Sequence, residues 1–278
     1  MKIARFLILT IAGVAVFSLT MTFAPIMPRW ADYASFAGLL LLTGLLWLFA
    51  RGALAEYRPV FFAFFAAVAG LALAAFCTDP LLGLLHLSAN TPMGSSIAKL
   101  INATLTVVGI IVVAKLAGQS MGSLFIQKGR LWLGLAIGLL GFAVFVGLTF
   151  GPNGPFFKAA ATDGGLTKIL PIVPWVLVFV LSNAFMEELL FRGLLLGRYE
   201  KLMGPWLALF ATTIGFALAH VQVNYTAQVA GFVAFVFVLG LIWGVLMQKT
   251  KSIWGSVLFH AGADVAVILP IYQQMAGS

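Results

Sequence analysis

Long apolar runs, separated by short polar interruptions, occupy most of the chain. Most of the nine runs hold about 18–22 residues, and at 1.5 Å per residue such a helix crosses a hydrocarbon core of ~30 Å. Pro59 and Pro205 each open a run, which suits the first helical turn, where a missing N–H is harmless. The pattern predicts helices near 6–24, 33–50, 59–77, 97–118, 131–150, 171–197, 205–222, 227–247 and 253–270. We therefore predict an all-α fold, a polytopic transmembrane helix bundle of about nine helices, or eight if the first is absent or cleaved.

The composition supports this class. Hydrophobic residues make up 62% of the chain, charged residues make up 9%, and the mean hydropathy is +1.09. These values are typical of a polytopic membrane protein and not of a soluble domain. The single cysteine, Cys77, excludes a disulfide framework and a thiolate metal cluster. The net charge of +8 comes from basic residues scattered singly between apolar runs, so we expect the lipid bilayer, and no nucleic acid, as a partner.

The distribution of basic residues predicts an orientation. An odd number of crossings puts the two ends of the chain on opposite sides of the membrane. With a cytoplasmic N-terminus, twelve of the sixteen Lys and Arg residues lie on the cytoplasmic side, and only Arg29, Lys99, Lys158 and Lys168 lie on the other. This asymmetry follows the positive-inside rule. We predict an integral protein, of the bacterial inner membrane, with a cytoplasmic N-terminus and an extracytoplasmic C-terminus.

The first apolar run also resembles a signal peptide at its start, because Lys2 and Arg5 precede it. The run is long, however, no Ala-x-Ala cleavage site is apparent, and Pro25 follows Ala24. These features favour a retained first helix. Its removal would leave the remaining topology unchanged.

The chain divides loosely into two parts. Residues 1–150 supply five predicted helices with little polar chemistry, and their role cannot be read from the sequence. The longest predicted loop covers about 151–170. The four helices in 171–270 carry all of the candidate chemistry. Residues 78–96 form a second predicted external loop, with an apolar stretch that suits the membrane interface.

Three short patterns place ionisable groups inside apolar runs: Glu187-Glu188-x-x-x-Arg192, Phe216-x-x-x-His220 and His260-x-x-x-Asp264. They hold three of the eight acidic residues and two of the three histidines. A charged side chain near the centre of a membrane helix costs at least roughly 2.5–3.5 kcal/mol on insertion scales. Such residues are therefore functional candidates, and here they come as a set.

The two glutamates of the first pattern are expected to do different work. Neighbouring residues point about 100° apart on a helix, so Glu187 and Glu188 cannot both face one spot. Glu188 and Arg192 have the i, i+4 spacing of an ion pair. Glu187 has no partner in its own helix, and in an apolar site it would suit a general base or acid. The alternative interpretation is a structural charge cluster that joins helices.

The two histidines leave two chemistries open. A lone intramembrane histidine is more often a hydrogen-bonding link between helices than a catalyst. Two histidines on separate helices, beside a Glu-Glu helix, favour catalysis. His220, His260 and Glu187 could hold one divalent metal such as zinc, which would activate a water. Without metal, the same groups could orient and deprotonate a water directly.

The order of the three patterns resembles the CAAX protease and bacteriocin-processing (CPBP) family of intramembrane endopeptidases. The neighbouring residues fit as well: Glu187-Glu188-Leu189-Leu190-Phe191-Arg192-Gly193, and Ser252-Ile253-Trp254-Gly255-Ser256 before His260. The resemblance covers about residues 171–270. It implies a peptide-bond hydrolase, glutamate-dependent or metal-dependent, whose active site lies within the membrane and opens toward the cytoplasm.

The resemblance also implies roles for individual residues. Glu187 and His220 would activate the water, and His260 with Asp264 would steady the oxyanion or complete a metal site. Glu188, Arg192 and Phe216 would support them. The prenyl-protein proteases have Asn where this chain has Asp264. An ionised Asp cannot donate a hydrogen bond, so Asp264 is either protonated, orients His260, or ligates metal.

One feature of the predicted helices does not fit a shared site. At 1.5 Å per residue, Glu187 lies ~15 Å from the cytoplasmic end of its helix, His260 ~10 Å and His220 ~22 Å. Tilt can absorb some of this spread. Otherwise, the predicted start of the seventh helix is too early.

Three functions follow in order of preference. The first is an intramembrane protease that cleaves a membrane-associated or lipidated peptide or protein. The second is a catalytically dispensable membrane scaffold, or a regulatory partner of a sensor kinase or transporter. The third is a proton-coupled transporter, because buried carboxylates and histidines also build proton relays. The transporter hypothesis predicts inverted repeats, and the sequence has no convincing repeat.

Overall fold

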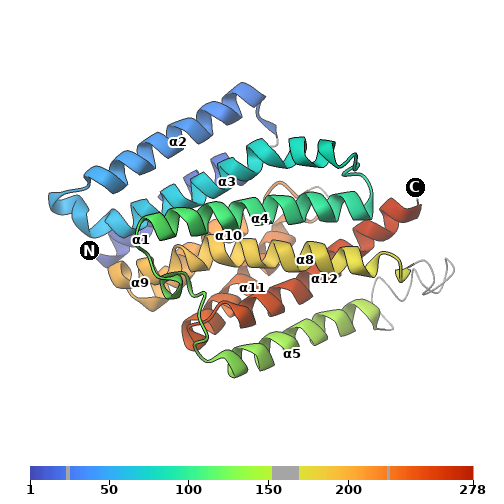
Figure 1. The fold of residues 1–278 in the computed structure, drawn as a ribbon. Helices are drawn as coiled ribbons and strands as arrows, with labels where there is room; N and C mark the ends of the chain where they lie inside the picture. Colours follow the sequence, from blue (N-terminus) through green and yellow to red (C-terminus); the bar gives the residue numbers. More distant parts are fainter. Residues whose placement is uncertain (23–25, 152–168, 224–225, 278) are drawn as a thin grey trace.

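The computed structural model describes residues 1–22, 26–151, 169–223 and 226–277, and these residues contain helices and no strand (Figure 1). The chain starts with α1 (Lys2–Phe17), which continues into the π-helical turn η1 (Ser18–Thr22). The other long helices are α2 (Arg29–Phe49), α3 (Arg58–Leu84), α4 (Pro92–Leu116), α5 (Leu131–Phe150), α8 (Val173–Glu188), α9 (Leu196–Met203), α10 (Pro205–Leu218), α11 (Val229–Thr250) and α12 (Trp254–Gly277). Shorter turns are η3 (Gly52–Tyr57), η4 (Met121–Leu124) and the π-helical η5 (Leu189–Gly193).

The polytopic bundle predicted from the sequence is confirmed. Eight helical stretches of the described residues are long and apolar enough to span a membrane, and α8, η5 and α9 together form one of them, Val173–Met203. The ninth helix, α10, is apolar but has 14 residues, about 21 Å at 1.5 Å per residue. The two termini lie at opposite ends of the bundle (Figure 1).

Several predicted boundaries are wrong. The third helix does not end at residue 77 but runs to Leu84, with Pro80 inside it, and α4 starts at Pro92. The predicted loop 78–96 therefore shrinks to 85–91, because the apolar residues after Pro80 continue the helix and Leu82 is buried. Thr91 caps α4 by accepting a hydrogen bond from the Gly94 N–H.

The sixth predicted helix also extends past residue 197. It continues through η5 and α9 to Met203 and ends at Gly204, whose φ of +89° is readily adopted only by glycine. Pro205 then occupies the first turn of α10, as predicted. Glu187 is thus ~24 Å from the end of its helical stretch, and His220 is ~22 Å from the start of α10, at 1.5 Å per residue. The predicted mismatch in depth between these two residues disappears.

The depth of His260 has a separate cause. The turn between α11 and α12 is covered by the segment that links α4 to α5. The Ile253 N–H donates to the Phe125 carbonyl (3.0 Å), the Arg130 N–H donates to the Thr250 carbonyl (2.7 Å), and the Ser252 hydroxyl donates to the Gln127 carbonyl (2.9 Å). Since this segment lies over the turn, α12 begins inside the bundle, and His260 lies deeper than its position along the helix indicates.

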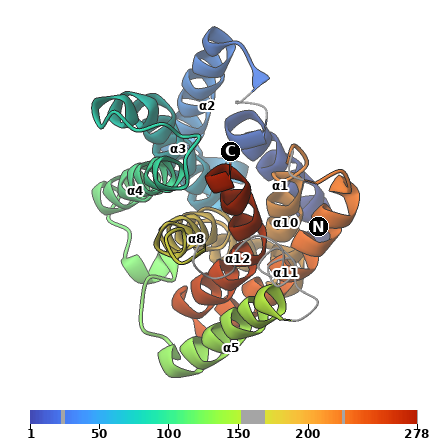
Figure 2. The ribbon, with the colours of Figure 1, turned by 90° about the vertical axis from the view of Figure 1, so that its right-hand side faces the viewer.

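The helices of residues 1–150 pack against the helices that carry the three patterns. Seen from the end that holds the C-terminus, α1 to α4 lie above or to the left of α8 and α12, α5 lies below them, and α10 and α11 form the right-hand edge (Figure 2). α5 packs along α12, α4 packs against α8, and α1 packs against α10. The N-terminal helices therefore cover part of the helices of the site.

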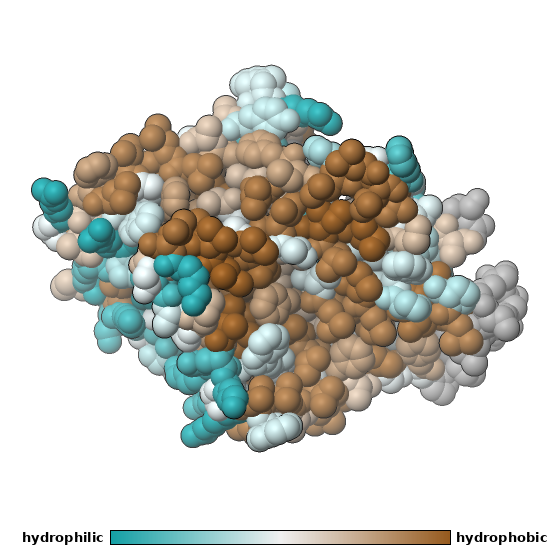
Figure 3. Space-filling view, in the orientation of Figure 1, coloured by the Kyte–Doolittle hydropathy of each residue, from teal (hydrophilic) through white to brown (hydrophobic). Residues whose placement is uncertain are grey.

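The surface agrees with a membrane protein. Hydrophobic residues cover much of the side of the molecule seen in Figure 3, and hydrophilic residues gather toward the end that holds the N-terminus. Two of the twelve basic residues assigned to that side, Arg192 and Arg198, do not lie at the surface but are buried in the bundle. The asymmetry remains large without them.

Candidate active site

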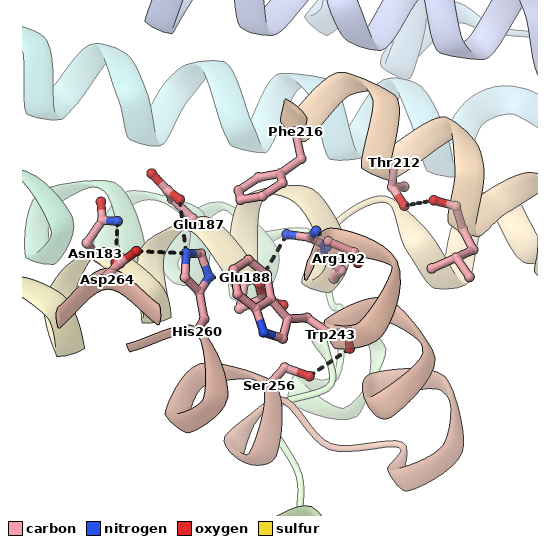
Figure 4. Close-up of polar contacts among 12 residues, drawn as sticks. Asn183, Glu187, Glu188, Arg192, Thr212, Phe216, Trp243, Ser256, His260 and Asp264 are labelled. Carbon is pink, nitrogen blue, oxygen red and sulfur yellow. Dashed lines mark hydrogen bonds and ion pairs between the residues drawn. The ribbon is translucent and has the colours of Figure 1, made fainter. Parts of the chain in front are cut away.

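Glu187, His220 and His260 meet in the middle of the bundle, although 73 residues of sequence separate the first from the last. The Glu187 Oε2 atom lies 3.6 Å from His260 Nε2 and 4.0 Å from His220 Nε2. α8 supplies Glu187, α12 supplies His260, and the turn after α10 supplies His220. Figure 4 shows Glu187 and His260 directed toward each other.

Glu188 points away from Glu187 and forms a buried charged network. Its Oε1 atom accepts hydrogen bonds from Arg192 Nη1 and His260 Nδ1, each at 3.0 Å, and the side chains of Glu188 and Arg192 are 0% exposed. The i, i+4 ion pair predicted from the sequence is therefore present. Arg192 also donates to the Gly240 carbonyl (3.2 Å), which fixes the guanidinium against α11.

The backbone between the two partners of this ion pair is not α-helical. Residues Leu189–Gly193 form a π-helical turn, and the Leu194 N–H donates to the Leu189 carbonyl at 2.8 Å. Single π-helical turns inside α-helices occur frequently at functional sites. The hydrophobic pattern predicts a regular helix over this stretch, and no residue pattern there signals the wider turn.

Aromatic rings hold the two histidines in place. The Trp243 ring stacks on His260 with centroids 3.9 Å apart and planes 12° apart. Phe216 packs its edge against both imidazoles, at 4.8 Å from His220 and 5.7 Å from His260. The Arg192 guanidinium lies 4.2 Å over the Phe216 ring. Phe216 is thus a packing centre for the site, in line with the supporting role expected for it.

The backbone sets the ring orientation of His220. Its Nδ1 atom lies 2.9 Å from the Phe216 carbonyl oxygen. A carbonyl can only accept, so Nδ1 carries the proton and donates. In the neutral ring, Nε2 is then an acceptor that faces Glu187.

Asp264 joins the site through both of its oxygens. Oδ1 lies 3.5 Å from His260 Nε2, and Oδ2 accepts a hydrogen bond from Asn183 Nδ2 at 2.9 Å (Figure 4). Asn183 was missed in the sequence analysis. A signal for it exists, because Asn183 precedes Glu187 by four residues and so shares its helix face. Trp243 was missed too, and an aromatic residue in an apolar run gives no such signal.

A cavity of about 170 Å³ adjoins these groups. Besides the site residues, its lining is mostly apolar: Phe179, Phe232, Phe235, Val236, Leu239, Val267 and Ile268. Phe179 precedes Glu187 along α8, and Ile268 follows His260 along α12. Both directions lead to the bundle end that holds the C-terminus (Figure 1).

The direction of this cavity conflicts with one expectation. With a cytoplasmic N-terminus, the cavity extends from Glu187 and His260 into the extracytoplasmic half of the bundle. The resemblance implied an opening toward the cytoplasm. The predicted orientation and that opening are therefore incompatible, and the basic residues favour the orientation.

The metal-bound alternative does not fit the observed donor set. Among the described residues, no group of three or more His, Cys, Asp and Glu side chains is arranged to hold a metal ion. The set expected from the sequence was His220, His260 and Glu187. Of these, His260 binds Glu188 through Nδ1 and faces Glu187 and Asp264 through Nε2.

The chain was compared with known proteins and protein families. No curated protein and no solved structure matched it. A family model described as "Type II CAAX prenyl endopeptidase Rce1-like" matches residues 169–266. This segment runs from just before α8 into α12 and contains every residue of the three patterns. The match agrees with the family that those patterns predicted: residues 169–266 are similar to the type II CAAX prenyl endopeptidases, a family of proteases.

Proposed function

We propose that this protein is an intramembrane endopeptidase that hydrolyses a peptide bond of a membrane-associated or lipidated peptide or protein, with a water activated by Glu187 and His220. One observation carries this proposal. The Glu187 Oε2 atom is buried, lines the cavity, and has no hydrogen-bond partner. A buried carboxylate oxygen without a partner is costly, and a water or substrate group bound there would satisfy it.

The gap between Glu187 and His220 has the size of a water site. Their facing atoms are 4.0 Å apart, too far for a direct hydrogen bond and close enough for one water to contact both at about 2.8 Å. His220 Nε2 accepts one proton of that water, and Glu187 accepts the other. The lone pair of the water oxygen is then free to attack a carbonyl carbon in the cavity.

The reaction follows as a proton transfer and an addition. Glu187 takes a proton from the water as its oxygen bonds to the carbonyl carbon of the substrate, and the carbonyl oxygen becomes an oxyanion. The proton then passes to the amide nitrogen as the C–N bond breaks, which yields a carboxylic acid and an amine. A positioned general base contributes about 10²–10⁴-fold to such a step.

His260 is placed to stabilise the oxyanion. Glu188 faces its Nδ1 and Asp264 faces its Nε2, so a protonated ring has an acceptor at each nitrogen. Asp264 accepts from Asn183, which fits a carboxylate that orients His260 rather than one that donates to the oxyanion. Arg192 and a protonated His260 together would offset two of the three carboxylates.

The cavity lining indicates the kind of substrate. Aromatic and aliphatic side chains surround the polar centre, so the residues beside the scissile bond should be apolar or should carry a lipid. In the predicted orientation, that bond is reached from the extracytoplasmic half of the membrane.

The test is cleavage of membrane-anchored fluorogenic peptides, with varied apolar or lipidated residues at the cut, by purified wild type and Glu187→Gln. The amide keeps the shape of the side chain and cannot take the proton, so cleavage should fall at least about 10²-fold. Glu56→Gln is the matched control, because Glu56 pairs with Arg5 away from the site and its loss should leave cleavage unchanged. Folding of each variant is checked by its unfolding midpoint in detergent.

Cleavage by Glu187→Gln at the wild-type rate would contradict the proposal. In that case, the alternative of a membrane scaffold or regulatory partner becomes the better interpretation. A well-folded wild type that cleaves none of the peptides, while binding a partner protein equally well with and without Glu187→Gln, would support the same alternative.

A further inference from the structure

A second cavity, of about 740 Å³, lies at the end of the bundle that holds the N-terminus, far along the helices from Glu187. The start of α3, the end of α4, η4, α9 and the end of α11 surround it. We call it the basic cavity, because four of its lining residues are cationic and one is acidic: Arg58, Arg198, Lys201, Lys251 and Glu200. The proposed protease reaction uses none of them.

Several cationic groups of the basic cavity have donors to spare. Lys201 has no hydrogen bond or ion pair within the described part of the chain, and Arg58 uses only Nε, which donates to the Trp47 carbonyl at 2.9 Å. Lys251 pairs with Glu200, the one acidic residue of the lining, and its Nζ lies 3.7 Å from Glu200 Oε2. The lining therefore keeps an excess of positive charge with free N–H groups, which suits an anion with several acceptor oxygens.

The buried arginine of this cavity is held rigidly. Arg198 is 7% exposed and donates from Nη1 to the Leu194 carbonyl at 2.6 Å, while its guanidinium lies 5.3 Å from the Phe62 ring. A guanidinium fixed in this way adds a permanent positive charge at the inner wall of the cavity.

The surface beside the basic cavity is apolar and exposed. Leu116, at the end of α4, is 84% exposed, and Leu48 and Phe49, at the end of α2, are 54% and 64% exposed. Trp47, which lines the cavity, is the kind of residue enriched at membrane interfaces. A pocket of positive charge next to an apolar surface, at the end of membrane-spanning helices, matches a phosphate headgroup with its acyl chains alongside.

We propose that the basic cavity binds the headgroup of an anionic phospholipid from the leaflet at the N-terminal end of the bundle. Arg58 and Lys201 contact the phosphate, Arg198 contributes charge from the inner wall, and the acyl chains lie along the exposed residues of α2 and α4.

The proposal is tested with purified protein in nanodiscs of phosphatidylcholine, to which phosphatidylglycerol is added in steps, with the unfolding midpoint and retained lipid as readouts. Phosphatidylglycerol should raise the midpoint of the wild type. In Arg58→Gln/Lys201→Gln, its apparent affinity should fall roughly tenfold to thirtyfold, since both cations are proposed to contact the phosphate directly. Lys2→Gln/Lys249→Gln removes the same charge at the same end, outside the cavity, and should leave the affinity unchanged.

Three results would overturn the proposal. Equal loss of affinity in the control pair would make the effect one of general surface charge. An unfolding midpoint of the wild type that is equal with and without phosphatidylglycerol would show that an anionic headgroup is not needed. The same shift with millimolar inorganic phosphate alone would identify a soluble anion, and not a lipid, as the occupant.

Discussion

At the scale of residues, the two adjacent glutamates differ in what they contact. Glu188 accepts from two cationic partners and is 0% exposed, whereas the Glu187 side chain retains 9% exposure toward the cavity and has an oxygen without a partner. Removing one member of a buried ion pair leaves the other charge without compensation. The fold therefore needs Glu188 and Arg192 together. Glu187 remains free to react.

This difference predicts how Arg192 variants behave. Arg192→Met leaves the Glu188 carboxylate without its guanidinium partner and should destabilise the fold by roughly 3–5 kcal/mol, seen as a lower unfolding midpoint in detergent. Adding Glu188→Gln removes the stranded charge and should recover much of the loss. A double variant no more stable than Arg192→Met would contradict the account.

A second prediction concerns Asp264, which faces His260, and Asn183, which donates to Asp264; in the proposed function they orient His260 together. Asn183→Ala and Asp264→Asn should each lower kcat about tenfold or more with little change in KM, since both loosen the orientation of a group needed in the transition state. The kcat of the double variant should be no lower than that of the less active single variant, because the effects of coupled residues do not add. Effects that multiply would show that the two residues act independently.

The sequence revealed the charged residues of the site but not their neighbours. Glu187, His220 and His260 stand out because an ionisable group in an apolar run needs a reason. Trp243 and Phe216 are apolar, so their burial in a membrane helix needs no reason, and only the second belonged to a recognisable pattern. What they contact depends on helix packing, which apolar composition does not determine.

At the scale of elements, the site depends on a close approach of two helices. Gly240 of α11 accepts from Arg192 through its carbonyl. A Cβ atom at this position would lie 2.7 Å from Arg192 Nη2 and 2.9 Å from Thr213 Cγ2. Small residues allow such contacts between membrane helices. A glycine at residue 240 therefore gives Arg192 the space that it needs in the buried network.

Gly240→Ala should therefore destabilise the protein by about 1–3 kcal/mol, the range for overpacking, and should lower activity because Arg192 is displaced. The measurement is the unfolding midpoint in detergent together with the cleavage rate. Gly231→Ala is a control on the same helix, where a Cβ would meet nothing within 4 Å. It should be neutral or slightly stabilising, and a loss equal to that of Gly240→Ala would refute the packing argument.

The helix boundaries show which local features a hydrophobic pattern misses. Among the described residues, the pattern found the eight stretches that are long enough to cross a bilayer and the shorter α10. It stopped the sixth helix at residue 197, where polar residues begin, although α9 continues to Met203. The buried side of α9, which includes Arg198 and Tyr199, packs inside the bundle, so polar residues there do not mark a loop.

At the scale of the whole molecule, the packing order of the helices could not be predicted. Surfaces that face lipid and surfaces that face other helices are both apolar, so composition does not distinguish them. The packing of the N-terminal helices against α8, α10 and α12 (Figure 2) is therefore a result of the structure alone. It gives these helices a physical role, since they cover part of the helices that carry the buried charges of the site.

The side of the membrane that the active-site cavity faces follows from the orientation of the whole bundle. Lys115 is exposed at the end of α4 that lies with the N-terminus, and Asn90 is exposed in the short loop at the other end. With a cytoplasmic N-terminus, Asn90→Cys should react with a membrane-impermeant maleimide in intact cells, and Lys115→Cys should react only after permeabilisation. Both are made in a Cys77→Ala background, which removes the single native thiol.

The reverse labelling pattern would put the N-terminus outside, and the cavity would then extend into the cytoplasmic half of the membrane. The excess of basic residues at the N-terminal end favours the first result. Under that result, a peptide anchored in the extracytoplasmic leaflet should be cleaved in sealed vesicles of known orientation when it is added to the face that carries Asn90. The same peptide added to the opposite face should stay intact, because its scissile bond cannot reach the cavity from that side of the membrane.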